Sequence, residues 1–280
     1  MAIGMSSSLG EKKLFLLDMD GTLYLGNTLF PRTKEFLSYL AESGRRAVYL
    51  TNNSSKSVSA YVEKLSRLGI DACEDDFFTS VEATIDYMRA HYKNGEKVYV
   101  FGTRSFYERI ASSGINATDE YGEDIKVLLC GYDTELTYKK IEDACRLLFR
   151  GCDFIATNPD WVCPTEYGCA PDCGSVCWTL TKATGKVPRY IGKPEPEMVI
   201  SAAAKYGYAL SETALVGDRI YTDIASGKAA GVQSLFVLCG EGTLEDIEKM
   251  KIEPDRVFAD VGEICDELKK YDTDGKKVGK

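Results

Sequence analysis

The sequence predicts an α/β protein built on parallel sheets. Short apolar runs alternate with amphipathic stretches, several of these runs end in polar or acidic residues, and glycine closes many of the amphipathic stretches. Such alternation is typical of βαβ units around a parallel sheet. No tandem repeat is visible, and 280 residues are enough for one large or two modest domains.

Composition narrows the class of protein. Hydrophobic residues make up 44% of the chain and charged residues 28%, which is typical of a soluble globular protein. The net charge of −9 argues against a nucleic-acid polymer or a membrane surface as partner. The N-terminal stretch lacks an apolar signal region, and no run reaches the roughly 18 to 20 apolar residues of a membrane span. Together with ten cysteines that we interpret as reduced thiols, this predicts a cytoplasmic protein.

Two βαβ units are predicted before residue 80. Residues 13–18 and 45–53 are apolar runs with polar ends, and we expect them to be strands. Residues 31–44 and 57–69 place apolar side chains at helical spacing and end at a glycine, so we expect helices there.

The middle of the chain continues the alternation of predicted strands and helices. We expect strands at 96–102, 124–132 and 153–158, and helices at 137–151 and 174–185. Beyond Lys186 compact units return, with strands at 189–194, 213–218, 233–242 and 256–261 and helices at 196–207 and 222–231. We expect the lysine-rich tail after Lys269 to be frayed.

Asp18 and Asp20 stand where the first predicted strand ends. Residues two apart on a strand point to the same side, so we expect both carboxylates to project into one small volume. Two ionised acids this close repel each other, and a divalent cation is the usual remedy. Gly21 lets the backbone turn sharply there, and its N–H can face an anion. The alternative is a solvated Asp-Gly turn.

Three further polar stretches follow later predicted strands. They contain Thr51, Asn52 and Asn53; then Lys193; then Asp218 and Asp223. Each alone has an ordinary explanation, as a strand end, a surface lysine or a helix cap. Because ligands of open α/β sheets bind at the carboxyl ends of the strands, all of them can reach one crevice. Together they supply what phosphoryl transfer needs: metal ligands, a nucleophile and groups that hold phosphate oxygens.

In this order, "DMDGT", "LTNN", "GKP" and "GDRIYTD" resemble the four motifs of the haloacid dehalogenase (HAD) superfamily. The wording of "FIATNPD", "GKPEPEM" and "VGDRIYTDI" is similar to the NagD-like, nitrophenylphosphatase-type branch of that superfamily. The resemblance spans residues 13–243. It implies a Rossmann-like parallel-sheet core with an inserted α/β cap domain.

The resemblance also implies catalytic roles. Asp18 is the nucleophile that forms an aspartyl-phosphate, and Asp20 is the general acid and base. Thr51 hydrogen-bonds the phosphoryl group, and Lys193 steadies the charged nucleophile and the phosphate. Members that dehalogenate generally lack the second acid, so Asp20 favours a phosphatase.

The implied cofactor is Mg²⁺. By the resemblance it is held by Asp18, by Asp218 and by the backbone carbonyl of Asp20. Asp223 is either a direct ligand or contacts the metal through another ligand. Mg²⁺ prefers hard oxygen ligands and keeps several waters, so few carboxylates suffice.

Motif spacing predicts an inserted lobe. Asp18 and Thr51 are 33 positions apart, enough for one crossover, whereas Thr51 and Lys193 are 142 positions apart. We therefore expect a core domain of residues 1–80 and 186–280 and an inserted domain of residues 81–185, which the resemblance identifies as a C2-type cap. Asn158 and Asp160 end a strand of this lobe, and either face the active site to bind substrate or form an ordinary Asn-Pro turn.

Two other features carry less chemistry. Cys163, Cys169, Cys173 and Cys177 lie within fifteen residues, but without paired Cys-x₂₋₄-Cys knuckles we expect packing in preference to zinc or iron–sulfur binding. His91 is the only histidine and its context suggests a solvent-facing helix end, which argues against catalysis through histidine.

The leading prediction is a Mg²⁺-dependent phosphatase for small phosphomonoesters such as sugar phosphates, nucleotides or p-nitrophenyl phosphate. The alternatives are a phospho-acceptor signalling module and a non-catalytic module that binds a phosphorylated ligand. The partner is then a small phosphorylated metabolite. The resemblance is also compatible with a homodimer, because relatives often dimerise through the cap.

Overall fold

The computed structural model describes residues 8–55, 57–165 and 167–278. The chain divides into two compact units, of which the first comprises Met1–Thr51, Val62–Phe78 and Pro194–Lys280. The second comprises Asn52–Tyr61 and Thr79–Lys193. The α/β class is confirmed. The core and cap boundaries inferred from motif spacing remain a prediction.

A six-stranded sheet forms the centre of the first unit, in the order β15-β14-β13-β1-β4-β5. Its bounds are β1 Leu14–Leu17, β4 Arg46–Thr51, β5 Phe77–Thr79, β13 Thr213–Gly217, β14 Gln233–Val237 and β15 Arg256–Phe258. The registered pairs from β15 through to β4 are all parallel. Every residue of β1, β13 and β14 is buried, as expected for parallel strands covered on both faces.

Helices cover this sheet. They are α1 Thr33–Glu42, α7 Glu197–Tyr206, α8 Ala225–Ala230, α9 Leu244–Met250 and α10 Val261–Val278, while α2 Val58–Arg67 belongs to both units. A short π-helical turn, Ile220–Ile224, leads directly into α8. The helix predicted at 31–44 begins two residues later than Pro31, because Arg32 adopts a left-handed conformation (φ 63°) at its N-cap.

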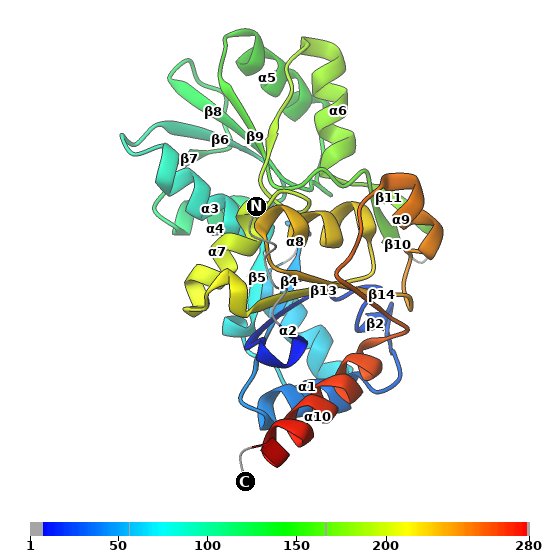
Figure 1. Cartoon of the computed structure of the whole chain (residues 1–280). Coiled ribbons are helices and arrows are strands. Elements are labelled where there is room, and N and C mark those ends of the chain that lie inside the picture. Colours follow the sequence, from blue (N-terminus) through cyan, green and yellow to red (C-terminus); the bar gives the residue numbers. More distant parts are fainter. Residues whose placement is uncertain (1–7, 56, 166, 279–280) are drawn as a thin grey trace, which may run out of the picture. The chain divides into compact units, whose positions relative to one another are not determined.

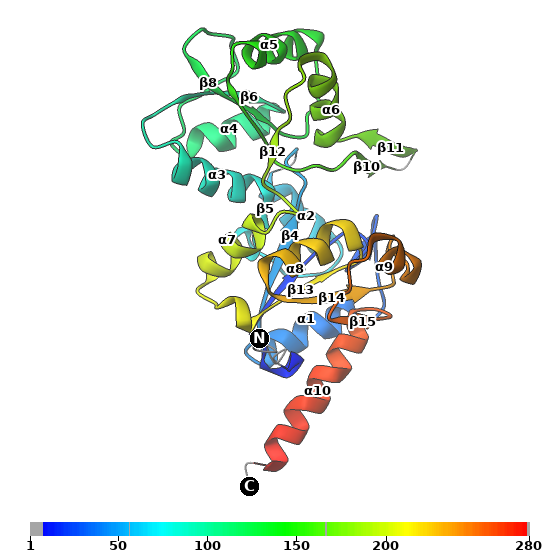
Figure 2. The same cartoon turned by 45° about the horizontal axis from the view of Figure 1, so that its top comes forward.

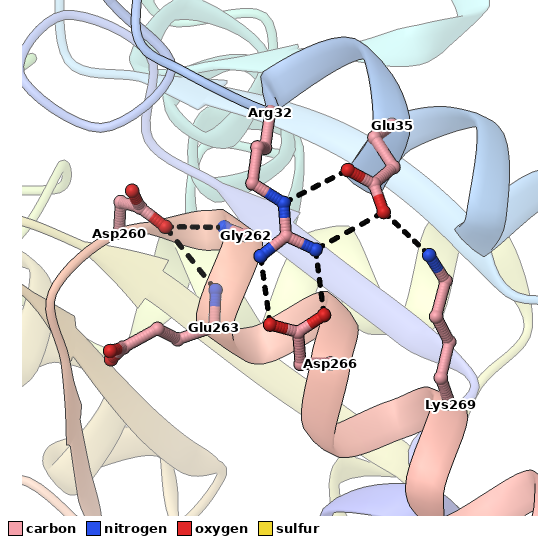
Figure 3. A network of polar contacts seen from close by, with 7 residues as sticks. All are labelled: Arg32, Glu35, Asp260, Gly262, Glu263, Asp266 and Lys269. Atoms are coloured by element: carbon pink, nitrogen blue, oxygen red, sulfur yellow. Dashed lines mark hydrogen bonds and ion pairs between the residues drawn. The ribbon is translucent and has the colours of Figure 1, made fainter.

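The expectation of a frayed tail after Lys269 was wrong, because α10 continues to Val278. Figures 1 and 2 show α10 beside α1, and Figure 3 shows the polar contacts that join them. Arg32 binds Asp266 through two hydrogen bonds of 2.8 and 2.6 Å, and Lys269 donates to Glu35 at 2.6 Å. Further along the helix, Asp272 extends the anchorage by accepting from Arg45 and Tyr39. Such long-range contacts are not visible in local sequence.

The second unit has its own sheet, in the order β12-β9-β8-β6-β7, and its registered pairs are all parallel. The strands are β6 Lys97–Phe101, β7 Ala117–Thr118, β8 Ile125–Cys130, β9 Asp153–Ala156 and β12 Arg189–Tyr190. Helices α5 Tyr138–Phe149 and α6 Cys173–Thr184 lie together on one face, and α3 Ser80–His91 and α4 Arg104–Ser112 on the other (Figures 1 and 2). Tyr99, Leu128 and Leu147 belong to the core under α5 and α6.

This unit differs from the sequence-based expectation in several details. Helix α4 and strand β7 were not predicted. The run at 189–194 was grouped with the strands after Lys186, but Arg189 and Tyr190 pair with β9 in the second sheet. The chain also forms an antiparallel hairpin, β10 Val162–Thr165 with β11 Gly168–Pro171. The hairpin was not predicted, because apolar and polar residues do not alternate regularly in this cysteine-containing stretch.

Candidate active site

Three carboxylates converge at the carboxyl edge of the first sheet. Asp18 follows β1 and Asp218 follows β13, and because these strands pair in parallel, the N–H of Asp18 donates to Val216 at 2.9 Å. Asp223 comes from the turn Ile220–Ile224. One carboxylate oxygen of each of these aspartates lies within 4.8 Å of the others. The structure therefore brings together the three carboxylates that were predicted to bind the metal.

Burial and charge conflict within this cluster. Asp218 and Asp223 are each only 1% exposed. Burial, followed by the repulsion of Asp223, raises the pKa of Asp218 to about 6. Two donors oppose this shift: the N–H of Glu241 at 2.7 Å and the hydroxyl of Thr22 at 3.2 Å. A divalent cation would relieve the remaining repulsion, and three hard oxygen donors fit Mg²⁺.

Gly21 is required beside this cluster. Its φ is +94°, and a Cβ at this position would lie 2.3 Å from Oδ2 of Asp218. Its N–H donates to the carbonyl of Tyr24 at 2.8 Å, which closes the turn after Asp20. The glycine thus lets the chain turn while the Asp218 carboxylate passes close to the backbone.

Asp20 differs from Asp18 in its surroundings. Its side chain is 53% exposed and lies 3.4 Å from the ammonium of Lys64, which also sits 3.9 Å from the centre of the Tyr24 ring. The carboxylate of Asp20 does not belong to the three-carboxylate group found among the described residues. Because β1 ends at Leu17, strand alternation does not extend to these residues, and the expectation that both carboxylates project into one volume remains a prediction.

A second set of predicted residues lies in the second unit. Asn52 is 8% exposed and its Nδ2 donates to the carbonyl of Lys193 and to Asp160, both at 2.9 Å. The N–H of Lys193 returns a bond to Asn52 Oδ1 at 2.9 Å. A Cβ on Gly192 would lie 2.5 Å from that same oxygen. Asn52 therefore holds the backbone on which Lys193 is mounted, and its binding of phosphate remains a prediction.

The other asparagines are also engaged within the protein. Asn158 is fully buried; it accepts from Thr157 at 2.7 Å and donates to Asp160 at 3.0 Å and Asp172 at 3.2 Å. This favours the structural alternative for Asn158, whose contact with substrate remains a prediction. Asn53 accepts the N–H and hydroxyl of Ser55, both at 2.9 Å. Thr51 is the last residue of β4, in the first unit.

The sequence-based reading missed Arg219 and Glu241. The N–H of Arg219 donates to Asp223 at 3.1 Å, and its guanidinium lies 2.9 Å from the Glu241 carboxylate. Burial alone would lower the pKa of Arg219, but nearby Tyr221, Asp18 and Glu241 raise it overall. Glu241 follows β14, at the same sheet edge as Asp18 and Asp218, so the strand-end rule could have found it.

The four clustered cysteines and the histidine lie in the second unit. Cys173 and Cys177 are buried with their sulfurs 3.9 Å apart, whereas Cys163 is half-buried and Cys169 is exposed. Hydrogen bonding with a neighbouring thiol, and then burial, raise the pKa of both Cys173 and Cys177, which disfavours thiolates. His91 ends α3, is exposed and stacks on Tyr87.

Comparison with known proteins gives the family. Residues 15–116 match the model described as haloacid dehalogenase-like hydrolase, and residues 190–264 match one described as HAD-hydrolase-like. The chain is 35% identical to an acid sugar phosphatase of Staphylococcus aureus, over 93% of this chain and 99% of that protein. The chain belongs to the haloacid dehalogenase-like hydrolases. It is an enzyme of the NagD-like, nitrophenylphosphatase-type branch and a phosphatase.

Solved structures of relatives agree with this membership. A 4-nitrophenylphosphatase from Thermotoga maritima is 38% identical with a TM-score of 0.87, covering 93% of this chain and 98% of that one. A glycerol phosphate phosphatase from Mycobacterium tuberculosis, solved in complex with magnesium, is 28% identical with a TM-score of 0.85, covering 92% and 78%. Within the described part of the chain, no helix is both long and apolar enough to cross a membrane.

Proposed function

We propose that this HAD phosphatase is a Mg²⁺-dependent phosphomonoesterase for small phosphorylated metabolites. Sugar phosphates are the substrate class favoured by the name of the Staphylococcus aureus relative, and p-nitrophenyl phosphate is favoured by that of the Thermotoga maritima relative. Nucleotides complete the set of candidates. The observation that carries the proposal is the convergence of Asp18, Asp218 and Asp223 at one sheet edge.

We assign the two steps of hydrolysis to Asp18 and Asp20. An oxygen of Asp18 attacks phosphorus while the bond to the leaving oxygen breaks, and Asp20 donates its proton to that oxygen. Water then attacks the phosphorus of the aspartyl-phosphate and gives its proton to Asp20, which releases phosphate and restores the Asp18 carboxylate. The exposed position of Asp20 beside Lys64 leaves its carboxyl free of the metal-binding cluster and accessible to exchange protons.

The remaining residues bind and orient. Asp18, Asp218 and Asp223, with the carbonyl of Asp20, would hold Mg²⁺, whose charge offsets the repulsion between the nucleophile and the phosphate. Thr51 and Lys193 are assigned to the phosphoryl oxygens. The N–H of Gly21, which we expected to face an anion, instead donates to the carbonyl of Tyr24. The Asn52 side chain supports Lys193 through two hydrogen bonds to its backbone. A third hydrogen bond joins the Asn52 side chain to Asp160.

Phosphate release from p-nitrophenyl phosphate and a panel of sugar phosphates and nucleotides tests the proposal. We expect many turnovers per enzyme with Mg²⁺, none with EDTA, and loss of turnover in Asp18→Asn. A single turnover that stops at a stable phosphoprotein would favour a phospho-acceptor module, and undiminished turnover by Asp18→Asn would refute the nucleophile. Glu267→Gln, which removes an ion pair with Arg256, is the control and should keep full turnover.

A further inference from the structure

Two main-chain N–H groups hold the two most buried acids of the cluster. The N–H of Glu241 donates to Oδ2 of Asp218 at 2.7 Å, and the N–H of Arg219 donates to Oδ2 of Asp223 at 3.1 Å. Each donor therefore helps to orient one carboxylate. The direction in which each acid presents its oxygens therefore depends on where these two backbone positions lie.

The side chains of the same two residues are joined to each other. Nε of Arg219 lies 2.9 Å from Oε2 of Glu241, and the hydroxyl of Tyr221 donates to Oε1 of Glu241 at 3.3 Å. Arg219 precedes the turn Ile220–Ile224, whereas Glu241 belongs to the segment after β14. The ion pair thus connects two backbone segments that are separate in the chain.

The segment that carries Glu241 lies tightly against the cluster. A Cβ on Gly240 would be 2.1 Å from Oδ2 of Asp218, and the N–H of Gly242 donates to the Asp218 carbonyl at 3.1 Å. A small displacement of this segment would therefore change the position or the hydrogen bonding of Asp218 directly.

We propose that Arg219 and Glu241 form a positioning clamp that fixes the orientation of Asp218 and Asp223 and so strengthens binding of a divalent cation. The inference rests on the proposed function in one respect, namely that the cluster holds such a cation. Arg219 and Glu241 are positioning residues, because they act through the two aspartates.

The physical reason lies in the mutual repulsion of the acids. Two buried carboxylates gain free energy by turning apart or taking up a proton, and either change removes an oxygen donor from the cation. The ion pair opposes the first change by restraining both backbone donors. Because the Glu241 side chain is 56% exposed and that of Arg219 is 22% exposed, the pair contributes little to global stability. Its effect should appear in cation affinity more than in unfolding.

Simple electrostatics and the clamp predict opposite results for one substitution. Removing the positive charge in Arg219→Met would strengthen binding of a cation if Arg219 acted only through its charge. The clamp predicts weaker binding, because the N–H that holds Asp223 and the segment that holds Asp218 are no longer tied together. Glu241→Gln keeps the shape of the side chain and breaks the same ion pair by removing its negative charge.

Calorimetric titration of Mg²⁺ into the substrate-free protein measures this directly. We expect the Kd for Mg²⁺ to rise about three- to tenfold in Arg219→Met and in Glu241→Gln. The Kd of the double variant should be no higher than that of the weaker-binding single variant, because both substitutions break the same contact. Glu267→Gln removes the ion pair between Arg256 and Glu267, also in the first unit, and should leave the Kd unchanged.

Thermal unfolding without Mg²⁺ checks that the variants fold, and Arg219→Gln, which also removes the charge, replaces Arg219→Met if the latter unfolds. Unchanged or tighter Mg²⁺ binding by Arg219→Met, or additive losses in the double variant, would overturn the clamp while leaving the proposed function intact. Failure of the unsubstituted protein to bind Mg²⁺ would instead refute the metal-dependent function itself.

Discussion

Asp218 combines burial, a neighbouring acid and the close approach of backbone. It accepts hydrogen bonds from Thr22 and Glu241, yet its pKa is still raised to about 6, first by burial and then by Asp223. A carboxylate held in this state is destabilising for the metal-free protein at neutral pH and useful to it as a cation ligand.

The raised pKa of Asp218 predicts how stability depends on pH. Its ordinary pKa is about 3.9, so between about pH 4 and pH 6 the folded protein holds a proton that the unfolded chain has lost. This group therefore favours folding most below about pH 4, and the benefit declines as the pH rises to about 6. In EDTA at neutral pH, Asp218→Asn should raise the free energy of unfolding by about 1–2 kcal/mol, and at about pH 4 by much less.

Denaturant titrations of both proteins at the two pH values measure this difference. Adding Mg²⁺ at neutral pH should reverse the order, because only the unsubstituted protein gains the binding free energy. A variant that is less stable than the parent in EDTA at neutral pH would contradict the argument.

Gly21 gives a second prediction at the scale of one residue. Gly21→Ala adds a methyl group 2.3 Å from the Asp218 carboxylate at a φ of +94°, so it should destabilise the fold and weaken Mg²⁺ binding. Gly44→Ala is the matched control: its φ is +74° and nothing lies within 4 Å of the added Cβ. We expect the control to cost about 1 kcal/mol from backbone strain alone, and Gly21→Ala to cost at least about 2 kcal/mol. Equal losses of stability and an unchanged Kd for Mg²⁺ would show that the close approach has no effect.

At the scale of elements, the strand ends of the sheet determine where the chemistry lies. Parallel pairing of β1 with β13 and of β13 with β14 brings Asp18, Asp218 and Glu241 to one edge, although they are far apart in the chain. Asp20 lies further from its strand than Asp18 does, three residues after β1 ends at Leu17. The strand therefore fixes the first acid, and the turn at Gly21 gives the second acid a different environment.

The sequence predicted five of the six strands of the first sheet and the acids at their ends, because buried parallel strands appear as unbroken apolar runs. It did not predict the short strand β5. It did not predict the full length of α10, the hairpin β10 with β11, or the ion pair of Arg219 with Glu241. The tail of α10 is polar, and its order depends on Arg45 and Tyr39, more than two hundred positions earlier. Such contacts have no local signature, so pattern and propensity cannot reveal them.

Helix α10 offers a comparison of two anchors. Asp272 binds Arg45, which is 9% exposed and also donates to the carbonyls of Lys12 and Gly10, whereas Asp266 binds the exposed Arg32 in the network of Figure 3. Asp272→Ala leaves the buried guanidinium without its carboxylate and should cost about 2 kcal/mol. Asp266→Ala should have a distinctly smaller effect, because water replaces an exposed partner. Denaturant unfolding of both variants measures the two losses in the free energy of unfolding. The prediction fails if Asp266→Ala loses more than Asp272→Ala.

At the scale of the whole molecule, the chain passes between its two units more than once. The first unit gathers three separate segments of the chain, and the second gathers two. All three carboxylates of the cluster come from the first unit, whereas Asn52, Asn158 and Lys193 belong to the second. The three carboxylates and Lys193 therefore belong to different compact units, and the effect of Mg²⁺ on each unit can be measured separately.

Hydrogen exchange with and without Mg²⁺ tests how far the two units depend on each other. A ligand that binds only the native state stabilises the structure that carries its donors. We expect Mg²⁺ to slow amide exchange in β1, β13 and residues 218–242, with little change in β6, β8 and β9 of the second sheet. Asp218→Asn is the control and should abolish the protection, because it removes a buried donor of the cluster. Equal protection of both sheets would contradict independent opening and mean that the two units unfold together, as one cooperative structure.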